Sequence, residues 1–300
     1  MTDTSQIRRA SAGSVELAYE TFGDPADPPV LLVMGFATQM LGWPDEFCRL
    51  LAARNLFVVR FDNRDIGLST HLHDAPPPDV MAAVAGDTSS ASYTLSEMAG
   101  DTVGLLDALG LTSAHLVGIS MGGMIAQTVA IEHPERVRTL TSIMSTTGDP
   151  SVGGATPEAL GALLAPPATT REEAQARAVA AYRVIGSPGY PLDEEWVQRV
   201  AGESYDRAYD PVGVARQLLA VRASGDRRPA LAGLDVPTLV IHGEDDPLIQ
   251  VEGGRETAAA VPGAELVVIP GMGHNLPREL WPRFVDGIVG LADRADAARR

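Results

Sequence analysis

Short runs of apolar residues alternate with amphipathic stretches along most of the chain. Continuous apolar runs are typical of strands buried on both faces of a parallel sheet, and apolar residues spaced three and four apart predict helices. This alternation predicts an α/β fold with a mostly parallel central sheet flanked by helices. The expected buried strands are 30–34, 56–61, 114–119, 137–144, 237–242 and 264–269, with 15–22 as a half-exposed edge strand. The expected helices are 41–54, 95–109, 121–132, 251–261 and 280–293.

Two stretches interrupt the alternation. Residues 72–93 are rich in Pro, Ala, Asp and Ser and indicate a loop. Residues 148–225 carry several helical patterns and no buried strand, although they lie between two expected core strands. We therefore expect one core, formed by residues 1–147 and 226–300, that is interrupted by a helical cap, or lid. We call residues 148–225 the cap segment.

The charged residues restrict the chemistry. The 300 residues include 39 acidic and 23 basic side chains, a formal net charge of −16, and every basic residue is Arg. Without Lys the chain cannot form a Schiff base, anchor pyridoxal phosphate or build a P-loop. Because nucleic-acid binding needs a basic face, we expect no nucleic-acid partner.

The single cysteine and the N-terminal residues say little about the chemistry of the protein. Cys48 is the only cysteine, so no intrachain disulfide can form, and its amphipathic surroundings predict a small buried side chain. No apolar run approaches the ~18 residues of a membrane span. Residues 1–6 include an acidic residue and lack the apolar stretch of a signal peptide. We expect a cytoplasmic monomer or homodimer without a membrane partner.

Residues 118–122 carry the most specific motif, Gly-Ile-Ser-Met-Gly, between an expected strand and an expected helix. This setting is that of a nucleophile elbow, in which a strained turn flanked by small residues exposes a serine. We therefore predict that Ser120 is a nucleophile. Its hydroxyl needs an adjacent base and the base needs an orienting carboxylate, in the chain order Ser, Asp or Glu, His.

The base and the acid are expected in turns that follow later strands. His274 lies in a glycine-containing turn after the last expected strand and is the predicted base. Three carboxylates compete in the turn after strand 237–242: we choose Asp246, with Asp245 as the alternative, and expect Glu244 to cap or pack.

We expect no catalytic role for the other histidines. We expect structural roles for His242, His115 and His133. His71 and His73 have the spacing of a metal-ligand pair, but a metallohydrolase requires more His and carboxylate ligands nearby. We therefore expect no metal.

Acyl transfer also needs two backbone N–H donors for the developing oxyanion. We expect them from Met121, directly after the nucleophile, and from Phe36, in the glycine-containing loop after the first buried strand. The Phe36 ring would then line an acyl pocket, and the alternative is a plain turn with a core Phe. Met34 would contribute to an apolar pocket of adaptable shape.

The cap segment supplies several aromatic side chains. Each either lines the pocket or packs cap helices together, and we select Tyr182 and Trp196 as candidate substrate contacts. The aromatic residues of the segment that we consider are Tyr182, Tyr190, Trp196, Tyr205 and Tyr209.

Together these motifs resemble the α/β-hydrolase superfamily over nearly the whole chain, and within it the aclacinomycin methylesterase group. The resemblance implies a Ser–Asp–His triad at Ser120, Asp246 and His274 and no cofactor. It also implies hydrolysis of a small apolar carboxylic ester, with a methyl ester of a polyketide-like aromatic acid as one candidate. The matching stretches are 22–27, 31–35, 41–47, 62–69, 117–122 and 269–274.

The chain departs from the superfamily pattern at two places. Met34 stands where His is usual before the oxyanion glycine, which makes the floor of the site more apolar. Asp65 occupies the second position of the turn 64–69, which we expect to brace the core near the oxyanion loop.

Several other activities share this architecture. Ser120 at the elbow excludes a haloalkane dehalogenase and an epoxide hydrolase, which would need Asp there. A C–C bond hydrolase, a lactonase or a perhydrolase could use the same triad, and a non-catalytic small-molecule sensor could keep the fold. Steady turnover of simple esters would distinguish an enzyme from a sensor.

Overall fold

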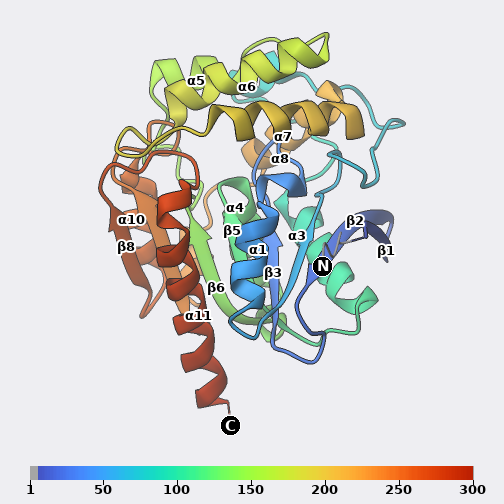
Figure 1. Cartoon of the computed structure of the whole chain (residues 1–300). Helices are drawn as coiled ribbons and strands as arrows, with labels where there is room; N and C mark the ends of the chain where they lie inside the picture. The colour runs from blue at the N-terminus through green and yellow to red at the C-terminus, as the bar shows by residue number, and fades with distance from the viewer. Residues whose placement is uncertain (1–5, 300) are drawn as a thin grey trace.

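The computed structural model describes residues 6–299, and the strands in this range form one sheet in the order β1-β2-β4-β3-β5-β6-β7-β8 (Figure 1). The first three strands in this order pair antiparallel, and the strands from β4 to β8 pair parallel. The predicted α/β architecture with a mostly parallel sheet is therefore confirmed. The strands are β1 (Arg8–Ala12), β2 (Val15–Phe22), β3 (Pro29–Val33), β4 (Phe57–Phe61), β5 (Ala114–Ile119), β6 (Val137–Ile143), β7 (Thr238–Gly243) and β8 (Glu265–Ile269).

The N-terminal edge of the sheet differs from the expectation. The segment 15–22 was expected at the edge, but β1 pairs along its outer side and most of β2 is buried, so that prediction is wrong. Sequence analysis also missed β1 itself. Only Ala10 and Ala12 of this strand are buried, which is too weak an alternation to stand out.

Helices cover both faces of the sheet. Leu31 and Val33 of β3 pack with side chains of α3 (Leu95–Ala108) and α4 (Met121–Glu132). Val30 and Leu32 point to the opposite face and pack with α1 (Asp45–Ala52) and α11 (Trp281–Ala298). Because successive side chains of β3 are buried on opposite faces of the sheet, its sequence is a continuous apolar run. The other core elements are η1 (Met40–Gly42), α2 (Val80–Val84), η2 (Pro134–Arg136), α9 (Arg228–Leu231), α10 (Val251–Ala260) and η3 (Arg278–Leu280).

The helices differ from the predicted ones mainly at three places. The expected helix 41–54 begins only at Asp45, because Pro44 is extended and the preceding residues form η1. The last helix continues to Ala298 instead of ending near residue 293, and Ala295 is buried on its inner face. The expected loop 72–93 contains the short helix α2, which the Asp79 side chain caps.

The cap segment lies between β6 and β7 in the chain and above one end of the sheet in Figure 1. Each of its helices is capped by the side chain of a Thr or Asp that accepts a backbone N–H, which satisfies donors that have no partner within the helix. The helices are α5 (Pro157–Leu163), α6 (Arg171–Ile185), α7 (Glu194–Arg207) and α8 (Pro211–Ala223).

Cys48 is buried in α1, as predicted, and burial raises the pKa of its thiol to about 12. Within residues 6–299, no helix combines the length and the apolar character that crossing a membrane requires. The expectation about a signal peptide rests mainly on residues 1–5, which lie outside the described part of the chain.

A buried ion pair joins α8 to the turn after β4. Asp65 has a left-handed backbone with φ 63°, and its carboxylate accepts hydrogen bonds of 2.8 and 2.9 Å from Nε and Nη2 of Arg216. Both side chains are at most 1% exposed. The turn therefore ties the cap segment to the core.

Replacing Arg216 by Ala is expected to lower the free energy of unfolding by about 3–5 kcal/mol, because it leaves the Asp65 carboxylate buried without its cation. The exposed Arg222, in the last turn of the same helix, is the control. Its replacement by Ala should cost less than about 0.5 kcal/mol. Urea unfolding measures both values, and equal losses in the two variants would contradict this role of the pair.

Candidate active site

Ser120 lies at the sharp turn between β5 and α4. Its backbone has φ 54° and ψ −121°, a conformation that residues with a Cβ rarely adopt and that functional sites often contain. Neighbouring backbone fixes this conformation: the Ser120 N–H donates to the carbonyl of Ile143 at 2.9 Å, and its carbonyl accepts from Gly123 N at 2.9 Å. The predicted elbow geometry is present.

Close packing explains the glycines on either side of the serine. A Cβ on Gly118 would lie 2.1 Å from the carbonyl oxygen of Gly122. A Cβ on Gly122 would lie 2.1 Å from the carbonyl oxygen of Val33. Because real Cβ atoms do not approach other atoms this closely, glycine is needed at both positions to bring the helix against the sheet.

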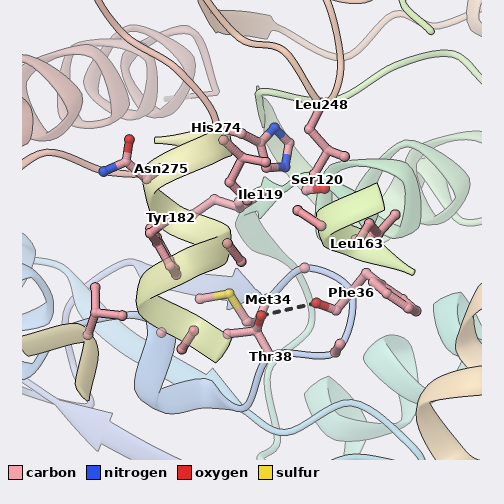
Figure 2. A pocket seen from close by; sticks show the side chains of 18 of the residues that line it. Met34, Phe36, Thr38, Ile119, Ser120, Leu163, Tyr182, Leu248, His274 and Asn275 are labelled. Atoms are coloured by element: carbon pink, nitrogen blue, oxygen red, sulfur yellow. Dashed lines mark hydrogen bonds between the residues drawn. The ribbon is translucent and has the colours of Figure 1, made fainter. Parts of the chain in front are cut away.

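His274 and Asp246 meet at the end of the sheet near Ser120. The imidazole Nδ1 lies 2.7 Å from Oδ2 of Asp246, and Oδ1 of the same carboxylate accepts the N–H groups of Leu248 and Ile249 at 2.9 Å each. Because a carboxylate accepts hydrogen bonds, Nδ1 carries the proton and Nε2 is left as an acceptor. Figure 2 shows the imidazole directed toward Ser120, and both residues line the same cavity.

The three carboxylates of this turn have different partners. Asp246 is buried and contacts His274. Asp245 is exposed, and its Oδ2 accepts the N–H of Gly271 at 2.8 Å. Glu244 is also exposed. Asp246 is therefore the carboxylate that can orient the imidazole.

His242 lies behind Asp246 and is fully buried. Its Nε2 is 2.7 Å from the carbonyl oxygen of Ile249 and 3.6 Å from Oδ2 of Asp246. Burial lowers the pKa of the His242 imidazole, so the ring is neutral at pH 7. These contacts agree with the expected structural role, and they place a second histidine behind the carboxylate.

Met121 follows Ser120 in the chain, and the loop that carries Phe36 approaches Ser120 at Gly35. Met121 is the first residue of α4, so its N–H has no acceptor within the helix. Phe36 follows Gly35, on which a Cβ would lie 3.2 Å from Cβ of Ser120. The Phe36 carbonyl accepts the hydroxyl of Thr38 at 3.0 Å, which Figure 2 shows as a dashed line. The loop thus approaches the serine closely and is fixed locally.

Two distant side chains also hold this loop. Ala37, with φ 56°, donates its N–H to Oε1 of Gln217 on α8 at 3.1 Å. Asn63 donates from Nδ2 to the carbonyl of Met34 at 2.9 Å. Sequence analysis did not single out either residue. Gln217 belongs to no local motif, and Asn63 lies in the matching stretch 62–69, whose sequence does not reveal this contact because the contact depends on the tertiary fold.

A cavity of about 820 Å³ lies between the core and the cap segment, and most of the side chains that line it are apolar. Asp246 lies behind the imidazole, away from the lining. The predicted site residues that line the cavity are Met34, Phe36, Ser120, Met121, Tyr182, Trp196 and His274.

The cap aromatics divide between the two roles considered. Tyr182, Trp196 and Tyr209 line the cavity, and desolvation raises the pKa of the Tyr182 phenol, which keeps it neutral. Tyr205 packs its ring on Tyr209 at a centroid distance of 4.8 Å. The Tyr190 hydroxyl donates to the carbonyl of Pro270 at 3.4 Å.

One group of described side chains has the composition of a metal site. Ligand atoms of His71, His73 and Asp210 lie within 4.8 Å of one another. Both ring nitrogens of His71 are already engaged: Nδ1 is 2.7 Å from Asp210 Oδ2 and Nε2 is 2.9 Å from the Gly67 carbonyl. The group does not line the cavity, so it has no direct part in chemistry at Ser120.

Comparisons with known proteins agree with this geometry. The chain is 33% identical over 291 residues to rhodomycin D methylesterase DauP of Streptomyces sp. (strain C5). The aligned region covers 90% of this chain and 92% of that enzyme. Rhodomycin D methylesterase DnrP of Streptomyces peucetius is 31% identical with the same coverage. The structure of the enol-lactonase from Burkholderia xenovorans LB400 has a TM-score of 0.72 and 26% identity, and covers 95% of this chain and 100% of that one.

A family model described as the alpha/beta hydrolase fold matches residues 28–277, which is most of the chain. The predicted family is thereby confirmed, together with the resemblance to the methylesterases. This chain belongs to the α/β-hydrolase family.

Proposed function

We propose that this protein is a serine carboxylic ester hydrolase that works through an acyl-enzyme intermediate. The observation that carries the proposal is the contact of 2.7 Å between His274 and the buried Asp246, directed toward a serine with strained backbone. This arrangement supplies a nucleophile, a base and an orienting acid. The similarity to two methylesterases supports an ester as the substrate.

In the proposed reaction Oγ of Ser120 attacks the ester carbonyl carbon while Nε2 of His274 takes the hydroxyl proton. Asp246 holds the Nδ1 proton and stabilises the imidazolium. The N–H groups of Phe36 and Met121 stabilise the tetrahedral oxyanion. Collapse of this intermediate breaks the ester C–O bond, and His274 returns the proton to the departing alcohol.

The acyl group is then bound to Ser120. His274 takes a proton from a water molecule, the resulting hydroxide attacks the acyl carbonyl, and the free acid leaves as Ser120 regains its proton. Each proton that His274 takes is returned in the following step, so the cycle needs no cofactor.

The cavity favours a bulky apolar acid, and the similarity to two methylesterases favours methanol as the alcohol of the ester. A volume of about 820 Å³ is within the range of sites that bind drug-sized ligands. We also propose that residues 148–225 form a cap that encloses the acyl group, since its helices supply much of the apolar lining.

A lactonase is the second candidate, because the chain is similar to an enol-lactonase over nearly its whole length. The chemistry at Ser120 would be the same. The leaving alcohol would stay attached to the acyl group, so the product would be one hydroxy acid in place of an acid and an alcohol.

A substrate series tests the preference for a bulky acyl group. The kcat/KM for the methyl ester of a three-ring aromatic acid is expected to exceed that for methyl acetate by at least about 100-fold. Burying an aromatic surface of ~150–250 Å² at ~25 cal/mol per Å² can supply more than the ~2.7 kcal/mol this requires. Equal values would contradict a large acyl pocket, and an aryl lactone hydrolysed faster than any open-chain ester would favour the lactonase.

A further inference from the structure

The backbone around His274 is attached to the cap segment. The His274 N–H donates to the carbonyl of Ile185, at the end of α6, with a distance of 2.7 Å. The N–H of Gly273 donates to Oγ of Ser187 at 2.9 Å. Two consecutive backbone donors of the histidine loop are therefore satisfied by residues of the cap segment.

The same loop of the cap segment makes two further contacts. Oγ of Ser187 donates to Oδ1 of Asn275, the residue after His274, at 2.5 Å. The N–H of Gly189 donates to the carbonyl of Gly271 at 2.8 Å. The Ser187 hydroxyl thus accepts a hydrogen bond from the residue before His274 and donates one to the residue after it. We call the contacts of Ile185, Ser187 and Gly189 with residues 271–275 the cap–histidine contact.

The two loops lie as close together as glycine allows. A Cβ on Gly273 would lie 2.2 Å from the carbonyl oxygen of Gly186. A Cβ on Gly189 would lie 2.7 Å from Cα of Gly271. At these glycines backbone lies directly against backbone, so a movement of the cap loop toward the histidine loop has to displace it.

The core holds the histidine loop from the other side. Asp245 accepts the N–H of Gly271 and donates its own N–H to the carbonyl of Met272 at 3.0 Å. These attachments end before residue 273. At residues 273 and 274 the backbone N–H groups donate to the cap segment, and the imidazole is held by Asp246.

We propose that Ser187 is a positioning residue for His274: through the cap–histidine contact it keeps Nε2 within reach of the Ser120 hydroxyl. The inference rests on the proposed role of His274 as the base. Catalysis depends steeply on such placement, since a displacement of about 1 Å at reacting groups can cost roughly 100-fold in rate. The triad then has its active geometry only when the cap segment contacts the histidine loop.

Kinetics of Ser187→Ala test the proposal. We expect kcat to fall about 10-fold with KM within about twofold of wild type, because Ser187 positions the base and does not line the cavity. Ser187→Thr keeps the hydroxyl and should retain kcat to within about threefold. Ser151→Ala is the matched control, since its hydroxyl donates at 2.7 Å to Asp149 within the cap segment and should leave kcat unchanged.

A second variant covers the case in which Ser187→Ala does not fold. Gly189→Ala places a methyl group 2.7 Å from Cα of Gly271, so one of the two loops must shift, and we expect this variant to fold with a lower thermal midpoint and a lower kcat. A folded Gly189→Ala protein with wild-type kcat would overturn the proposal. So would a Ser187→Ala protein whose kcat matches that of Ser151→Ala.

Labelling with a fluorophosphonate separates this inference from the function on which it rests. Wild-type protein that is neither labelled at Ser120 nor able to hydrolyse esters would refute the proposed function. Wild-type protein that is labelled and active, together with Ser187→Ala protein labelled at the same rate, would refute only the role of Ser187. Slower labelling of Ser187→Ala than of Ser151→Ala would support it.

Discussion

Replacing Ser120 by Ala is expected to lower kcat for a p-nitrophenyl ester by about 10⁴- to 10⁶-fold, because alanine cannot form the acyl-enzyme. The substitution keeps a Cβ at this position, so the elbow and its backbone hydrogen bonds should persist. Thermal unfolding of the variant should therefore resemble that of wild type. Initial rates and a melting curve on the same preparation measure both effects.

Ser145 offers a matched control for this variant. Its hydroxyl donates to the carbonyl of Ser120 at 2.8 Å, so it contacts the elbow without being the predicted nucleophile. Ser145→Ala should lose less than about 10-fold in kcat and about 1 kcal/mol in free energy of unfolding. More than about 1% of wild-type turnover in Ser120→Ala would place the nucleophile elsewhere.

Replacing Asp246 by Asn is expected to lower kcat by about 10⁴-fold. The N–H groups of Leu248 and Ile249 both donate to Oδ1, so the amide oxygen of Asn would stay there. The amide NH₂ would then face Nδ1 of His274 and favour the tautomer with the proton on Nε2. That tautomer cannot accept the proton of Ser120.

Asp245→Asn is the matched control for this second variant. Its amide oxygen can still accept the N–H of Gly271, so kcat should stay within about threefold of wild type. The same assay on both variants decides between the two neighbouring acids. A large loss in Asp245→Asn with a small loss in Asp246→Asn would reverse the assignment of the acid.

The fold was predictable where burial leaves a continuous mark on the sequence. The strand 114–119 is buried at every position and was predicted with its observed bounds. By contrast, β1 buries two alanines, and its existence depends on pairing with β2. The expected helix 41–54 was too long because the apolar periodicity continues through Gly42 and Pro44. In the structure Gly42 belongs to η1 and Pro44 is extended, so the helix begins only at Asp45.

The candidate site was predictable only where a local sequence motif marks its residues. Ser120, Asp246 and His274 each lie in a turn directly after a strand, where local sequence carries the signal, and their catalytic roles stay predictions. Ser187 and Gln217 had no such signal. Their contacts with the histidine loop and with Ala37 connect segments far apart in the chain, so these contacts depend on the tertiary fold.

Identifying the residue that a phosphonofluoridate labels is the most direct test of the account, because such a reagent reacts with a serine that a neighbouring base has activated. The account predicts that activity is lost as one phosphonyl group, with release of fluoride, becomes attached to the peptide that contains Ser120. It also predicts that labelling is far slower in Asp246→Asn. Loss of activity with the label on another residue, or full ester turnover without labelling of Ser120, would contradict it.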